Sequence, residues 1–171
     1  MTDSYQIAKL RETDRLFTLH SFEEDSDAAT RLVSQAEQEL RIFSHHLNNA
    51  VFGASPLIES VSAFARKNSH TSIRVLITDV RSATSGVHQF LNLARKQTST
   101  FECRKVNSDY AQQPEEFILV DRCGYIRFPR ANHFEAITNF HDPVKVRQLG
   151  VLFQEVWDCS ESDPELISFS I

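Results

Sequence analysis

Two hydrophobic periods alternate along this chain of 171 residues. Short, nearly continuous apolar runs are typical of buried strands, whereas apolar positions three and four residues apart are typical of amphipathic helices. The pattern predicts strands at 40–44, 73–77, 101–106, 117–120 and 125–128, and helices at about 26–39, from Ser55–Pro56, from Val87 and from Asp142–Pro143 onward. Strands and helices in alternation are typical of one α/β fold.

The clearest strand pair lies within PEEFILVDRCGYIRF, residues 114–128. Phe117–Val120 is a continuous apolar run that ends at Asp121. A turn at Arg122–Gly124 follows, and Tyr125–Phe128 resumes an apolar and polar alternation. Two such segments on either side of a glycine-containing turn predict two strands of one sheet.

The predicted helices carry caps as well as periodicity. The first is expected to begin at Ser26 or Asp25 as its N-cap, and to bury a stripe made of Ala29, Leu32, Val33, Ala36 and Leu40. The last is expected to bury Val144, Leu149, Leu152, Phe153, Val156 and Trp157.

These elements predict an α/β fold with a mostly parallel mixed sheet and helices on both faces. Residues 1–24 are expected to form an N-terminal arm with a candidate edge strand at 16–19, and residues 25–171 a single domain. Residues 129–142 are expected to form a long loop or a short irregular segment. The apolar tail, 160–171, is expected to fold back on the domain or to contact a second copy of the chain.

Composition and charge argue against several classes of protein. A net charge of −5 disfavours tight non-specific binding to nucleic acid, which needs a basic surface. The chain has 4 glycines and no Gly-rich phosphate-binding motif. Its 3 cysteines form no CxxC pair, which argues against a zinc site and fits a reducing compartment. No apolar run approaches the roughly 20 residues that span a membrane. We therefore expect a cytoplasmic protein with no metal, no cofactor and no membrane partner.

Candidate site residues follow from the expected sheet. Ligands gather at the carboxyl ends of parallel strands, and the polar residues expected there form a candidate anion pocket of His45, Asp79, His88, Arg104, Asp121 and Arg122. His88 is expected near a helix start, where backbone N–H groups suit an anion and a neutral imidazole could act as a base or nucleophile. Each histidine also has a packing, capping or surface role as its alternative, and each aspartate a role in ending a strand or capping a turn.

Residues from about 29 to 128 resemble a half-domain of the phospholipase D superfamily. The likeness rests on AEQELRIFSHHL, on SPLIESVSAFARKN with SIRVLITDV, and on FILVDRCGYIRF, in the family's order and at about its spacing. The resemblance implies that Asp121 stands for the aspartate of the HxKxxxxD signature. Glu116 then occupies the lysine position and Pro114 the histidine position. The chain is most similar to bacterial proteins that keep this fold and have lost the signature.

The degenerate signature changes what the resemblance implies about activity. In that superfamily the histidine attacks phosphorus, and the lysine neutralises the phosphoryl oxygens. Proline offers no nucleophile, and glutamate repels a phosphate. The resemblance therefore implies the fold without its chemistry, and no catalytic residue is assigned.

Three hypotheses for the function remain. The first is an inactive module that binds a ligand or partner; because complete enzymes of the superfamily pair two halves, the resemblance implies a homodimer or docking to another protein. The second is phosphate or nucleic-acid binding, favoured if Arg104, Lys105, Arg122 and Arg127 cluster on one face. The third is a phosphodiesterase with His88 as a relocated nucleophile, contradicted if that ring is buried against the core or lies more than about 10 Å from Asp121 and every basic side chain.

Overall fold

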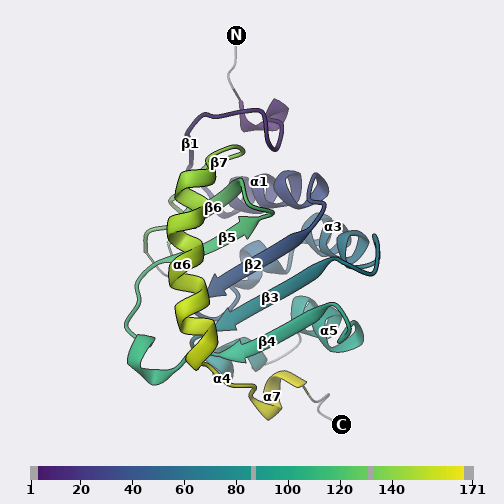
Figure 1. Ribbon diagram of the computed structural model, residues 1–171, viewed down its shortest axis with the longest axis vertical. Helices are drawn as coiled ribbons and strands as arrows, with labels where there is room; N and C mark the ends of the chain where they lie inside the picture. Colours follow the sequence, from purple (N-terminus) through teal and green to yellow (C-terminus); the bar gives the residue numbers. More distant parts are fainter. Residues whose placement is uncertain (1–3, 86–87, 131–132, 168–171) are drawn as a thin grey trace.

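One mixed sheet organises the fold (Figure 1). The computed structural model describes residues 4–85, 88–130 and 133–167. In these residues the sheet has seven strands in the order β1-β7-β6-β5-β2-β3-β4. The strands are β1 (Phe17–Leu19), β2 (Glu39–Ser44), β3 (Ser72–Ile77), β4 (Phe101–Lys105), β5 (Glu116–Val120), β6 (Gly124–Phe128) and β7 (Ala136–Asn139).

The strand directions divide the sheet into two parts. Strands β2, β3 and β4 are parallel, whereas β2–β5, β5–β6, β6–β7 and β1–β7 are antiparallel. The expected mixed sheet is confirmed, but its parallel part is the smaller one. The reason is the connections: residues 121–123 join β5 to β6, and a link this short can join only antiparallel strands.

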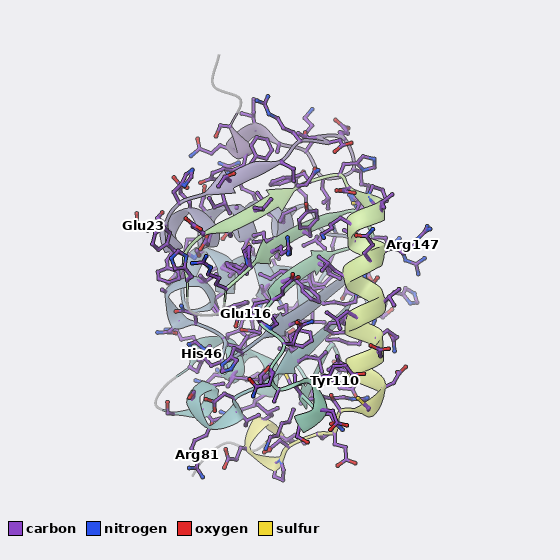
Figure 2. All side chains as sticks on the ribbon, turned by 90° about the vertical axis from the view of Figure 1, so that its left-hand side faces the viewer. Glu23, His46, Arg81, Tyr110, Glu116 and Arg147 are labelled. Carbon is purple, nitrogen blue, oxygen red and sulfur yellow. The ribbon has the colours of Figure 1, made fainter. Side chains whose placement is uncertain are left out.

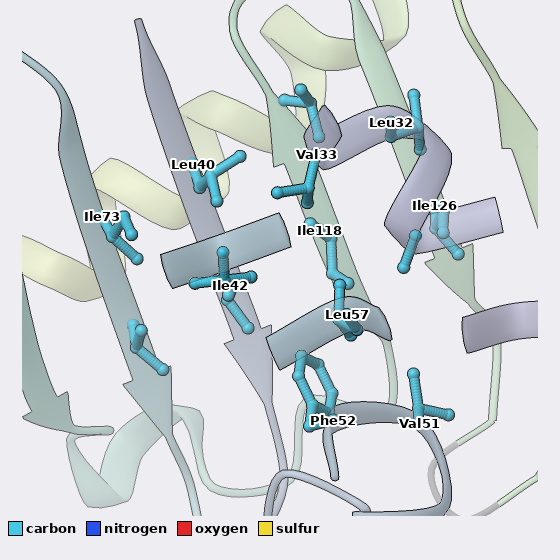
Figure 3. Packing of buried hydrophobic residues seen from close by; sticks show 14 of the residues in the cluster. Leu32, Val33, Leu40, Ile42, Val51, Phe52, Leu57, Ile73, Ile118 and Ile126 are labelled. Atoms are coloured by element: carbon cyan, nitrogen blue, oxygen red, sulfur yellow. The ribbon is translucent and has the colours of Figure 1, made fainter. Parts of the chain in front are cut away.

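Helices cover both faces of the sheet, as expected (Figure 2). One face carries α1 (Phe22–Ser34), α2 (Asn49–Phe52), α3 (Ser55–Ala65), α4 (Val80–Thr84) and α5 (Gln89–Lys96). Their apolar side chains pack on every second residue of the strands, so that Leu57 of α3 lies against Ile42 and Ile118 (Figure 3). This period of two arises because successive strand residues point to opposite faces.

The opposite face carries one long helix, α6 (Pro143–Cys159). Its buried residues, Val146, Leu149, Phe153, Val156 and Trp157, pack on Phe43, Leu76 and Phe117 of the sheet. Val144 was expected in this stripe but is exposed, because it lies two residues, or about 200° around the helix, from Val146. The short α7 (Pro164–Ile167) buries Leu166 against the first core, so the described part of the tail folds back; residues 168–171 lie outside the described residues.

Two boundaries differ from the expected ones for physical reasons. Ser21, whose Oγ accepts a hydrogen bond from the Glu24 N–H, caps α1 in place of Ser26 or Asp25. The helix ends at Ser34 rather than near 39, because the backbone N–H groups of residues 37–39 turn away to bind Asp121. Helix α1 thus spans residues 24 and 25, between which the N-terminal arm was expected to end and the domain to begin. The division into arm and domain stays a prediction.

Shorter elements complete the described chain. The candidate edge strand at 16–19 is confirmed as β1, which pairs with β7. Strand β7 itself lies where a loop or irregular segment was expected. The turns η1 (Tyr5–Ile7) and η2 (Ser108–Tyr110) are 3-10 helices. Helix α5 begins at Gln89, and Val87, where this helix was expected to begin, lies outside the described residues. In the part of the chain described, no helix has the length and apolar character needed to cross a membrane.

Candidate functional site

The predicted pocket residues lie at opposite ends of the sheet. His45 follows β2 and Asp79 follows β3, and the Asp79 backbone N–H donates to the His45 carbonyl at 2.6 Å. Strand β5 runs the other way, with Val120 beside Leu40, so Asp121 and Arg122 lie at the amino end of β2. The structure therefore brings His45, Asp79 and His88 to one end and does not join them to Asp121 and Arg122.

Glu116 lies at the carboxyl end of β2, where Asp121 was expected (Figure 2). Its carboxylate accepts hydrogen bonds from the His45 backbone N–H and from the Ser44 hydroxyl. A narrow cavity of about 10 Å³ lies beside it. Its lining is mostly aromatic and apolar and includes Phe22, Phe43, Ser44, Asn48, Phe117, Phe128 and His133.

Asp79 acts as the N-cap of α4. Its carboxylate accepts bonds from the Ser82 N–H at 3.0 Å and the Ser82 hydroxyl at 2.6 Å. These hydrogen bonds hold the pKa of Asp79 below its ordinary value, and nearby His45 and His46 lower it further. Asp79 is thus charged at neutral pH, and its carboxylate is already hydrogen-bonded to Ser82.

His88 is sealed inside the fold. Its Nε2 lies 2.7 Å from the Leu47 carbonyl oxygen, and since a carbonyl only accepts, Nε2 carries the proton. Its Nδ1 is buried with no hydrogen-bond partner among the described residues. Burial lowers the pKa of His88 because it disfavours the charged ring. The imidazole is therefore neutral and shielded from solvent.

Asp121 is a structural anchor at the other end of the sheet. It adopts a positive φ of 54°, which aspartate tolerates better than most residues, and it is 4% exposed. Its oxygens accept bonds from the N–H groups of Glu37, Gln38 and Glu39, and from Arg11 Nη2 at 2.7 Å. The carboxylate thereby ties the α1–β2 loop to the β5–β6 turn.

The four basic residues whose clustering would favour phosphate or nucleic-acid binding lie apart in the structure. Arg104 stacks on Trp157 at 4.3 Å and donates to the Trp157 carbonyl under the end of α6. Lys105 pairs through its backbone with Glu161. Arg127 binds Glu115, which lowers the pKa of that carboxyl, and Arg122 lies at the opposite end of the sheet. Arg104 and Arg127 both face α6, but three strands lie between β4 and β6, so these four residues form no single cluster among the described residues.

Sequence reasoning missed a different arginine cluster on the α6 face. Arg41, Arg74, Arg122 and Arg147 line an open cleft, which we call the arginine cleft. A signal was present: ELRIFS and SIRVLI carry an arginine at the same position, and the parallel register places Arg41 beside Arg74. Among the described residues, no group of three or more His, Cys, Asp or Glu side chains could hold a metal ion.

Several solved structures share this architecture. NucT from Helicobacter pylori has a TM-score of 0.65 at 10% identity, covering 88% of this chain and 98% of that chain. Nuc from Salmonella typhimurium, a phospholipase D family member, has a TM-score of 0.64 at 13% identity, covering 87% and 99%. The archaeal chromatin protein TrmBL2, whose structure shows a novel mode of DNA binding, has a TM-score of 0.63 at 12% identity and covers 89% of this chain; the match spans 55% of TrmBL2.

These likenesses establish the fold and no more, because the identities are low. The expected phospholipase D-like α/β fold is confirmed. No curated protein matches the chain significantly in sequence. A family model matches residues 21–169, most of the chain, and the protein belongs to the family described as Domain of unknown function (DUF7931).

Proposed function

We propose that this chain is a catalytically inactive phospholipase D-like domain that acts by binding a ligand or a partner. The observation that carries the proposal is Glu116, whose carboxylate is bound by the His45 N–H and the Ser44 hydroxyl where the resemblance calls for a lysine. A carboxylate there repels the phosphoryl group that a lysine attracts. Pro114, at the histidine position, has no group that could attack phosphorus.

The space around Glu116 supports the same proposal. Aromatic rings fill this end of the sheet and leave a cavity of about 10 Å³. A volume of that size holds about one water molecule. A phosphodiester and an attacking group need far more room than the described side chains leave.

The hypothesis of a relocated nucleophile has no support from the geometry of His88. Its ring is buried, and its Nε2 is engaged by a backbone carbonyl. A nucleophile must reach the phosphorus atom within roughly 3–3.5 Å, which this position prevents. Burial against the core contradicts a nucleophile at this position, and we do not propose one.

The experiment is a phosphodiesterase assay on the purified chain. We expect no hydrolysis of bis(4-nitrophenyl) phosphate or of a labelled oligonucleotide above the level of a buffer blank. Hydrolysis that copurifies with the protein and is abolished by His45→Ala or His88→Ala, but not by the exposed His20→Ala, would overturn the proposal. The comparison of the three variants separates real turnover from a contaminating nuclease.

Assembly is part of the same proposal. The resemblance implies two half-domains around one site, and we propose a homodimer or docking to another protein. Phe134 supports this, because it is 39% exposed and its ring stacks on His133 at 4.6 Å, next to the Glu116 cavity. In sedimentation velocity we expect twice the chain mass of 19.6 kDa, and Phe134→Ser is expected to shift the equilibrium toward monomer. A monomer at all concentrations would refute the homodimer.

We place the protein in the bacterial cytoplasm. The resemblance is to bacterial proteins, and Cys103, Cys123 and Cys159 are all free. Unpaired cysteines are typical of a reducing compartment. Fractionation of the source cells with an antibody to the chain tests this placement, and recovery in an oxidising compartment would refute it.

A further inference from the structure

The arginine cleft lies on the α6 face of the sheet, at the amino ends of β2 and β3. Arg41 and Arg74 are register partners on these parallel strands, Arg122 comes from the β5–β6 turn, and Arg147 projects from the outer side of α6 (Figure 2). The open space between them measures about 480 Å³. Small-molecule sites commonly enclose about 300–1,000 Å³, so the cleft is of the size that takes such a ligand.

The charge in this cleft is not balanced by its own residues. Four arginines and one acid, Glu39, line it. Glu39 lies 3.7 Å from Arg41 Nη2, 4.0 Å from Arg74 Nη2 and 4.0 Å from Arg122 Nε. These distances are at the outer limit of an ion pair, well beyond the roughly 2.7–2.9 Å of a charge-assisted hydrogen bond. One carboxylate is thus shared loosely among three guanidinium groups.

Two of the arginines are held in place. The guanidinium of Arg74 donates to Gln154 at 3.1 Å and lies over the rings of Phe153 and Trp157 at 5.5 and 5.4 Å. Arg41 packs against Gly150 of α6, where an added Cβ would lie 2.7 Å from Arg41 Nη1. Groups fixed before binding lose little conformational entropy when a ligand arrives.

Arg41 is the most buried of the arginines for which Glu39 is the shared acid. Its side chain is 12% exposed, and its Nε is buried without a hydrogen-bond partner among the described residues. Burial lowers the pKa of Arg41, Glu39 raises it, and repulsion from Arg74 and Arg122 lowers it again. An anion in the cleft would offset this repulsion, because it supplies opposite charge and acceptor oxygens.

We propose that the arginine cleft binds the phosphate group of a small phosphorylated molecule. This inference rests on the proposed function, because it names the site and the class of ligand of the proposed binding module. A phosphate has several oxygens and up to two negative charges, which suit convergent guanidinium groups better than a single carboxylate does. Val146, Val151 and Pro143 form an apolar wall beside the arginines, against which the rest of the ligand packs.

The test is calorimetric titration of the full chain with inorganic pyrophosphate and with ADP at low ionic strength. Both probes are expected to bind, and Arg122→Gln is expected to weaken binding by about tenfold, the loss typical of one charge-assisted hydrogen bond. Arg122 is 86% exposed, so the variant is expected to fold. Arg66→Gln, on an exposed residue at the end of α3, is the matched control and should bind as the wild type does.

A second pair of variants separates a built site from general surface charge. Glu39→Gln removes the acid that competes with the ligand and is expected to tighten binding several-fold. Glu37→Gln removes an exposed acid that pairs with Arg11 outside the cleft and should have a much smaller effect. Three outcomes would overturn the inference. The first is an equal effect of Glu39→Gln and Glu37→Gln, and the second is an equal loss of affinity in Arg66→Gln and Arg122→Gln. The third is that neither probe binds.

The outcomes of this test and of the phosphodiesterase assay are independent. Turnover of a phosphodiester would overturn the proposed inactivity and leave the cleft to be judged by the titrations. Absence of binding in the cleft would overturn this inference and leave the inactivity standing.

Discussion

Asp25 is a buried acid without a partner. It lies in the first turns of α1 and has no exposed surface, and neither of its carboxyl oxygens has a hydrogen-bond partner among the described residues. Burial raises its pKa from 3.8 to about 8, with a smaller contribution from the neighbouring Glu24. The folded protein therefore holds Asp25 protonated at neutral pH, whereas the unfolded chain ionises it.

This difference makes the stability of the fold depend on pH with a definite sign. Below about pH 4 both states are protonated, and Asp25 has no effect on the pH dependence. Between about pH 4 and 8 only the unfolded state loses the proton, so the free energy of unfolding falls by about 1.4 kcal/mol per pH unit. Above the folded pKa of about 8 both states are ionised and the loss stays constant, at about 6 kcal/mol.

The variant Asp25→Asn removes the titration at nearly constant side-chain volume. From pH 5 to pH 8 we expect the variant to gain about 4 kcal/mol of stability relative to the wild type. Urea unfolding measures this difference in stability when it is followed by the fluorescence of Trp157, the single tryptophan of the chain. Glu23→Gln is the control, because Glu23 belongs to the same turn and projects into solvent (Figure 2). A difference between Asp25→Asn and wild type that does not change with pH would refute the reasoning.

Three further substitutions test other parts of the structure. Asp121→Ala removes the acceptor of three backbone N–H groups and the partner of Arg11; we expect the free energy of unfolding in urea to fall by about 3 kcal/mol, and an unchanged value would contradict its anchoring role. Gly150→Ala should raise the unfolding free energy by less than the roughly 1 kcal/mol that helix propensity alone gives, because the new methyl would lie 2.7 Å from Arg41 Nη1 and must displace it; the full gain would refute that contact. Asp79→Ala removes the cap of α4 and should lower the unfolding free energy by about 1 kcal/mol. Because the pKa of Asp79 is depressed from 3.8, this difference should be present at pH 6 and shrink as the pH falls below about 4. A difference that does not change with pH would count against a charged cap.

The strands and helices that could be predicted are those whose hydrophobic pattern lies within their own residues. The apolar runs at 40–44 and 73–77 became β2 and β3, because a buried strand needs only its own residues to be recognised. Strand β7 was missed because Thr138 and Asn139, both buried, look like loop residues in sequence. Their polar atoms are bound by Tyr125, Arg15 and Asp14, partners more than ten residues away that no local pattern reveals.

The site prediction failed at one specific step. It assumed that every strand ends at the same edge of the sheet, which holds only for parallel strands. The turn at 122–124 already required β5 and β6 to be antiparallel, so one of them had to oppose β2. The structure shows that β5 is that strand, and the pairing of Phe43 with Phe117 places Glu116 rather than Asp121 beside His45.

The surroundings of the arginine cleft favour a small ligand over a nucleic-acid strand. A strand must meet positive charge over several successive phosphates, whereas an acid lies next to this cleft. Gln154, which lines the cleft, donates to Asp158 at 2.7 Å. A polyanion that left the cleft along α6 would meet this carboxylate on a chain of net charge −5, while a compact phosphate would contact only the guanidinium groups. Pyrophosphate should therefore compete with a labelled oligonucleotide at a much lower phosphate concentration than the oligonucleotide itself needs to bind, and the reverse order would identify a nucleic-acid surface.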